Sequence, residues 1–78
     1  MSGIAKQLAT VLRERFAIVA DEASRRDPSQ HLQRLKAVSE RIDDLTERLP
    51  HPVDPQLAHF LQRASYSKAL AFLEARGD

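Results

Sequence analysis

Residues 35–49 read LKAVSERIDDLTERL, and the rest of the fold can be worked out from this stretch. Its large apolar residues alternate at spacings of three and four along the chain: Leu35, Val38, Ile42, Leu45 and Leu49. This spacing places their side chains on one side of an α-helix, as an a/d seam of just over two heptads. Most positions between them are charged or polar, and Leu32 lies beside the seam. We therefore expect this helix to bury one narrow line and to expose its other faces to water.

Two breaks that contain proline bound this helix. Asp27-Pro28 precedes it, and Asp54-Pro55 ends the proline-rich run that follows it. An Asp before a helix accepts a hydrogen bond from a free backbone amide, and Pro is tolerated at the first helical position. The sequence thus predicts a helix over residues 28–49 and a new helix after the second break. A seam this short is not a long coiled coil, so it should pack on the preceding helix as an antiparallel hairpin.

The preceding segment carries the apolar stripe that this hairpin requires, and it predicts a helix over residues 3–25. Its members recur at spacings of three and four: Ala9, Leu12, Phe16, Val19 and Ala23. Asp21 and Arg25 are spaced to form an ion pair on an exposed helical face. Val11 and Ile18 widen the stripe to one side and exceed what the hairpin needs. This surplus predicts a second contact, most simply a twofold homodimer that buries both residues.

The last part of the chain has two apolar faces instead of one. On a straight helix, with about 100° between successive residues, Leu57 and Leu61 would point one way and Tyr66 and Leu73 the opposite way. Such a helix would have to be buried all round, or the chain must break where the stripe changes sides. We favour the break, because Ser65 is a suitable N-cap for a new helix that starts at Tyr66.

The apolar stripe of this segment changes from one side of the helix to the other near Ala64–Ser65. Ser is a favourable residue at the start of a helix, since its hydroxyl can accept a hydrogen bond from a free amide. We therefore predict two short helices, over residues 55–63 and 66–76, in place of one. An unbroken helix remains the alternative, because neither Gly nor Pro marks the position.

The tail also resembles a known repeat. Residues 60–74, FLQRASYSKALAFLE, are similar to the centre of a tetratricopeptide repeat, with the aromatic Phe60 before the turn and Tyr66 after it. The resemblance implies a helix-turn-helix hairpin, with Ala64 at the turn and Ala69 at the small position where the helices touch. Gln56 and Arg76 depart from the pattern, and no second copy precedes it. Since such repeats need several copies to bury their faces, we take from the resemblance the local geometry and not membership of the family.

The sequence offers little chemistry for a catalytic or metal site. It has no cysteine, which excludes disulfides, thiolate zinc sites and cysteine nucleophiles. Its two glycines are Gly3 and Gly77, so it has no glycine-rich phosphate loop. His51, Asp54 and His59 could in principle meet around a turn and hold a divalent metal. We interpret them as solvated side chains, and we predict no cofactor, no metal and no enzymatic activity.

Charge is balanced, with 12 Lys and Arg against 11 Asp and Glu, for a formal net charge of +1. Proteins that bind nucleic acid usually carry a basic excess or a basic stripe. The basic residues here are interleaved with acidic ones, and Arg25, Arg26 and Arg34 are the nearest approach to a cluster. A small dimeric nucleic-acid-binding regulator that uses these three residues is therefore the alternative hypothesis, and nucleic acid is not the expected partner.

The chain has no run of 18 apolar residues that could cross a membrane. Its N-terminal region also lacks the apolar block of a signal peptide, because Arg13, Glu14 and Arg15 interrupt it. We therefore expect a cytoplasmic protein with no membrane partner.

Together these patterns predict one all-α domain over residues 1–78, in which an antiparallel helical hairpin is joined by one or two shorter C-terminal helices in a bundle-like arrangement. A chain of 78 residues buries only about 60% of its unfolded surface. Without disulfides, oligomerisation is a common way to stabilise so small a core. The functional hypothesis is a structural or protein–protein interaction module that self-associates as a homodimer. Its expected interface residues are Val11, Ile18, Phe60, Tyr66 and Phe72.

Overall fold

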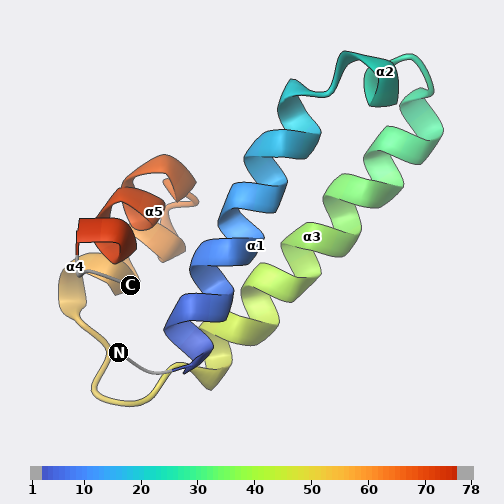
Figure 1. Cartoon of the computed structure of the whole chain (residues 1–78). Coiled ribbons are helices and arrows are strands. Elements are labelled where there is room, and N and C mark those ends of the chain that lie inside the picture. Colours follow the sequence, from blue (N-terminus) through green and yellow to red (C-terminus); the bar gives the residue numbers. More distant parts are fainter. Residues whose placement is uncertain (1–2, 76–78) are drawn as a thin grey trace.

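The computed structural model describes residues 3–75, and all its regular elements are helices (Figure 1). They are α1 (Gly3–Ala20), α2 (Glu22–Arg25), α3 (Pro28–Arg48), α4 (Pro55–Gln62) and α5 (Tyr66–Ala75). The long helices α1 and α3 run antiparallel and pack on each other, and α2 lies at the closed tip of this hairpin. The tail, formed by α4 and α5, folds back beside the other end of α1. This arrangement confirms the predicted all-α hairpin with shorter C-terminal helices.

The helices begin where the Asp-Pro steps predict. The Asp27 side chain accepts a hydrogen bond from the backbone N–H of Gln30 at 3.1 Å, with Pro28 in the first turn of α3. At the start of α4 the Asp54 side chain accepts from the N–H of Gln56 at 2.9 Å. Both carboxylates satisfy an amide that has no partner within its own helix.

The prediction of one helix over residues 3–25 was wrong. α1 ends at Ala20, and Asp21 adopts an extended backbone conformation with φ −80° and ψ 99°. Its carboxylate accepts a hydrogen bond from the N–H of Ser24 at 3.2 Å and so starts the short helix α2. An Asp side chain can replace a helical hydrogen bond in this way, which is why it favours helix starts over helix interiors. Asp21 pairs with Arg34 of α3, at 3.5 Å, and not with Arg25 as predicted.

The predicted break in the tail is present, since α4 ends at Gln62 and α5 begins at Tyr66. Ala64 has a positive φ of 55°. The N–H of Ser65 donates to the carbonyl of Phe60 at 2.8 Å, and the N–H of Ala64 donates to Leu61 at 3.1 Å. This pair of hydrogen bonds is a Schellman motif, which usually has Gly where Ala64 stands.

The tail therefore has the helix-turn-helix geometry that its resemblance to a tetratricopeptide repeat implied. Ala64 occupies the turn, and Ala69, at the small position of α5, is fully buried. Arg76 and the predicted end of the last helix at residue 76 lie outside the described residues.

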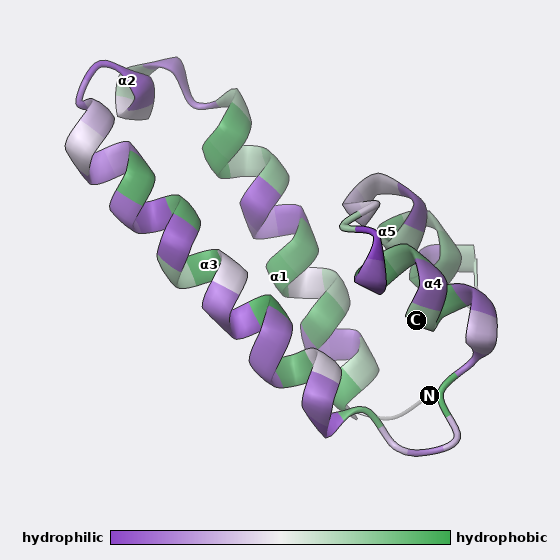
Figure 2. Cartoon of the chain, turned by 180° about the vertical axis from the view of Figure 1, so that it is seen from behind, coloured by the Kyte–Doolittle hydropathy of each residue, from purple (hydrophilic) through white to green (hydrophobic). Residues whose placement is uncertain are grey.

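The core is one cluster of buried apolar side chains contributed by α1, α3, α4, α5 and the loop after α3. Figure 2 shows α1 as largely hydrophobic, whereas α3 is mostly hydrophilic with hydrophobic positions at intervals. The reason is that α1 has two neighbours, α3 on one side and α5 on another. A helix between two neighbours needs a wide apolar stripe, and one that packs on a single neighbour needs only a seam.

This arrangement corrects the idea that Val11 is surplus. Val11 is 1% exposed and belongs to the core of the single chain, and Ile18 is partly buried against the same core. The extra width that Val11 and Ile18 give to the stripe on α1 is therefore used inside the molecule. Val11 therefore cannot contribute to a surface at which another molecule docks on this fold.

Candidate interaction surfaces

Burial divides the hairpin into two parts. In the covered half, which comprises residues 3–12 and 38–49, α1 is flanked by both α3 and the tail, and all the buried residues of α1 and α3 lie here. In the open half, residues 16–35, the two helical arms of the hairpin extend beyond the tail (Figure 1). No residue of the open half is buried.

The open half nevertheless carries large apolar side chains, which we call the open-half patch: Phe16, Val19, Leu32 and Leu35. Leu32 is 67% exposed and is the most exposed large apolar residue among those described. The other three are partly buried, yet they do not join the core cluster. The patch is thus apolar surface that the chain itself leaves incompletely covered.

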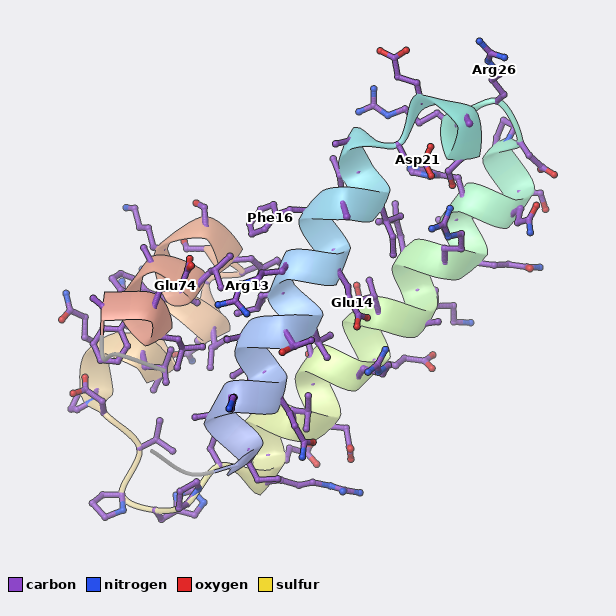
Figure 3. The ribbon with its side chains drawn as sticks, viewed as in Figure 1. Arg13, Glu14, Phe16, Asp21, Arg26 and Glu74 are labelled. Atoms are coloured by element: carbon purple, nitrogen blue, oxygen red, sulfur yellow. The ribbon has the colours of Figure 1, made fainter. Side chains whose placement is uncertain are left out.

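The patch continues the stripes that are buried in the covered half. On α1, Phe16 and Val19 follow Leu12 at spacings of four and three, so they share its face of the helix. On α3, Leu35 precedes Val38 in the same seam. Figure 3 shows Phe16 projecting from α1 on the side where the tail lies. On α1 the patch therefore continues, towards the tip, the side of the helix on which the tail lies, and on α3 Leu35 continues the seam that packs on α1.

Ion pairs on the hairpin balance its charges. Arg41 of α3 pairs with Glu14 of α1 at 2.9 Å. Arg13 of α1 pairs with Glu74 of α5 at 3.6 Å, and the two side chains face each other in Figure 3. All four side chains are about half exposed, so each pair contributes little to stability. Both pairs lie outside the open half, whose residues 16–35 contain three arginines and three acidic residues, so the open half has no formal net charge that would repel a second copy.

The aromatic residues expected at an interface pack on the chain itself. Phe60, Tyr66 and Phe72 are partly buried against the core. The guanidinium of Arg15 lies 4.8 Å from the centre of the Tyr66 ring, a cation–π contact that joins α1 to the start of α5. These residues hold the tail in place, and only parts of their rings remain accessible to a partner.

A second feature is an open groove between the end of α3, the loop that follows it and α4. Its volume is about 860 Å³, and its apolar lining comprises Ile42, Leu49, Pro52, Val53, Ala58 and Leu61. Asp43, Thr46, Glu47, His51 and Gln62 supply its polar lining. The groove exists because α4 packs chiefly on α5 and leaves space beside α3.

The histidines do not converge. Within residues 3–75, no group of three His, Cys, Asp or Glu side chains is arranged to hold a metal ion. His51 lines the groove, and Asp54 caps α4. His59 is exposed, with its ring centre 6.2 Å from that of Phe60.

The three arginines of the alternative hypothesis lie near the tip. Arg25 and Arg26 are exposed, and Arg26 points away from the body of the molecule in Figure 3. Arg34 is paired with Asp21. One of the three charges is thus partly neutralised within the chain.

Sequence reasoning missed the open-half patch and the groove. Phe16, Val19 and Leu35 belong to apolar stripes whose spacing predicts burial, so their spacing does not mark them as exposed. The offset of Leu32 from the seam was the one signal of an exposed apolar side chain.

The chain has no match among known protein families, curated protein sequences or solved structures. Among the described residues no helix has both the length and the apolar character to cross a membrane.

Proposed function

We propose that this protein is a small helical interaction module that self-associates through the open-half patch. The observation that supports the proposal is the apolar patch on the part of the hairpin that the tail does not reach. Two helices alone have no third element to exclude water from such a face. A second copy of the same face would supply it and would form a four-helix arrangement at the interface.

A second copy is the occupant that the chain itself favours. With 78 residues and no cysteine, the protein has a small core that oligomerisation would stabilise. A twofold interface brings the same patch of both copies together, so a face with compensated charges suits it. The nucleic-acid alternative has less support, because the net charge is only +1 and Arg34 is engaged by Asp21.

Sedimentation equilibrium over a wide concentration range tests the proposal. We expect a mass near twice 8.8 kDa for the unmodified chain at high concentration. The variant Leu32→Asp should sediment as a monomer, because burial of a carboxylate in an apolar interface is costly. Its folding should be unaffected, since Leu32 is 67% exposed, and circular dichroism would check this.

The matched control is Gln33→Asp, which adds the same charge at an exposed neighbouring position. Successive residues differ by about 100° around a helix, so this carboxylate points away from the patch. The control should self-associate like the unmodified chain. A monomer at every concentration, or a Leu32→Asp variant that still dimerises, would contradict the proposal.

A further inference from the structure

The groove beside α3 differs from the open-half patch in its charge. Its apolar lining is contributed by Ile42 and Leu49 of the α3 end, Val53 of the loop, and Ala58 and Leu61 of α4. Ala58 is small and exposed, which keeps the space between the helices open. The result is an apolar floor between α3 and α4, in which Ile42 and Leu49 are buried and Pro52, Val53, Ala58 and Leu61 are partly or fully accessible. This is the shape that accepts one face of an amphipathic helix.

One wall of the groove carries two carboxylates that have no side-chain partner among the described residues. Asp43 and Glu47 both line the groove, and they are four residues apart on α3, so their side chains lie on the same face. Like charges at this spacing destabilise a helix. Neither forms an ion pair or a hydrogen bond within residues 3–75. The neighbouring Asp44, which does not line the groove, is neutralised by Arg48 at 3.2 Å.

Within residues 3–75, the carboxylate of Asp44 beside the groove is therefore paired with a cation, and the carboxylates of Asp43 and Glu47 on the groove wall are not. A cation brought by a bound molecule would relieve the repulsion between Asp43 and Glu47. The opposite wall offers no basic side chain, because Ala58, Leu61 and Gln62 are the residues of α4 that line it. Among the described residues that line the groove, none supplies a positive charge that would complement Asp43 and Glu47.

We propose that the groove binds a basic amphipathic helix of another protein. Its aliphatic side chains would cover the accessible part of the floor, formed by Pro52, Val53 and Leu61. Its Lys or Arg side chains would lie against Asp43 and Glu47. A second copy of this chain fits less well as the occupant. Recognition of a helix in a groove needs several apolar anchors on one face, and among the described residues only Leu32 is a strongly exposed large apolar side chain.

The probe is a fluorescently labelled, amphipathic Leu/Lys peptide of about 18 residues, long enough for five helical turns. Fluorescence anisotropy with the full chain should show saturable binding that weakens as salt is added. A Leu/Glu peptide with the same apolar face should bind much more weakly, because it places like charges beside Asp43 and Glu47. Equal affinity for the two peptides would overturn the proposal.

Variants then locate the site. The double variant Asp43→Asn, Glu47→Gln should lower the affinity for the Leu/Lys peptide roughly five-fold, as expected for two exposed ion pairs. Asp44→Asn, which removes a neighbouring carboxylate outside the groove, should leave the affinity unchanged. Ala58→Gln should also weaken binding, since its longer uncharged side chain fills the space at an exposed position that tolerates it.

All three variants change exposed positions, so they should keep their helix content, and circular dichroism would check this. Unchanged binding by both the double variant and Ala58→Gln would place the peptide elsewhere and overturn the assignment. Peptide binding can be separated from self-association with the Leu32→Asp variant. Leu32 lies outside the groove, so this variant should bind the peptide as the unmodified chain does.

Discussion

The covered and open halves of the hairpin have the same apolar pattern but differ in what surrounds it. In the covered half α1 packs between α3 and α5, and Leu8 and Leu12 are completely buried. One turn further along the same stripe, Phe16 and Val19 are only partly buried and lie outside the core. Periodicity thus specifies which face of a helix is apolar. Whether that face is covered depends on how far a third element reaches.

The two halves are also closed by different interactions. Apolar burial closes the covered half, where α1, α3, α4 and α5 all contribute to one cluster. Polar interactions close the tip of the open half: Asp21 and Asp27 each cap a helix, and Arg34 reaches Asp21 across the connection. These interactions fix the path of the chain at the tip without burying the patch below it. The open half therefore has a defined backbone and an accessible apolar surface.

The largest expected difference between the halves comes from the same substitution at two positions of α1. Val11→Ala removes a side chain that is 1% exposed, and it should lower the free energy of unfolding by about 2–3 kcal/mol. Val19→Ala, in the open half, should cost about 1 kcal/mol or less because its side chain is already partly in water. Both replacements introduce Ala into the same helix, so the change in helix propensity is the same.

Urea unfolding of both variants, at a concentration low enough to keep the chain monomeric, measures this difference. A Val19→Ala variant as destabilised as Val11→Ala would mean that the open half is packed as tightly as the covered one. The distinction between the halves would then fail, and with it the argument for an accessible patch.

Much of this fold follows from local sequence. The seam of residues 35–49 and the two Asp-Pro steps correctly predicted α3 and the start of α4. The change of apolar face near Ala64 correctly predicted the break in the tail, because a straight helix cannot bury two opposite faces with so few neighbours. In each case residues close in sequence determine the outcome.

Other features were not predicted, either because a local signal was overlooked or because they depend on contacts that are distant in sequence. The break at Asp21 was missed because Ala23 continues the apolar period, although the carboxylate was able to cap a new turn. The burial of Val11 was missed because a stripe does not reveal how many neighbours a helix has. The groove was not foreseen for the same reason, since Ile42 and Leu61 meet there only through the loop after α3.

An effect of intermediate size should come from the turn that sets the tail against the covered half. Ala64 has a positive φ of 55°, which is unfavourable for any residue with a Cβ atom. Ala64→Gly should therefore stabilise the protein by about 1 kcal/mol, measured by chemical unfolding. Ala71→Gly, at an exposed position within α5, should destabilise it by a similar amount. If the two substitutions change stability in opposite directions, the stabilisation by Ala64→Gly comes from relief of the positive φ at the turn and not from greater flexibility of the tail.

The smallest expected effect concerns Asp21, whose cap and ion pair close the open half. The pKa of Asp21 is lowered, chiefly because its carboxylate accepts a hydrogen bond from the Ser24 N–H and in addition because Arg34 lies beside it. A carboxyl group with a pKa lower in the folded than in the unfolded state stabilises the fold above the unfolded value, about 3.9. This contribution should disappear as the pH falls through the lower, folded value. NMR titration of the Asp21 carboxyl carbon measures the shift directly.

The matching stability experiment follows thermal unfolding from about pH 6 to about pH 2. Asp21→Asn keeps an oxygen that can accept from Ser24 but removes the charge, so it separates capping from titration. The unmodified chain should be more stable than this variant at the upper end of the range, and the difference should vanish at the lower end. If Asp21 titrated at its unfolded value, or if the difference persisted in acid, the charge of Asp21 would not help to hold the tip together. The tip of the open half would then be held by the hydrogen-bonded helix caps alone. The two halves would still differ, but the polar contribution at the tip would come from capped backbone amides and not from the ion pair between Asp21 and Arg34.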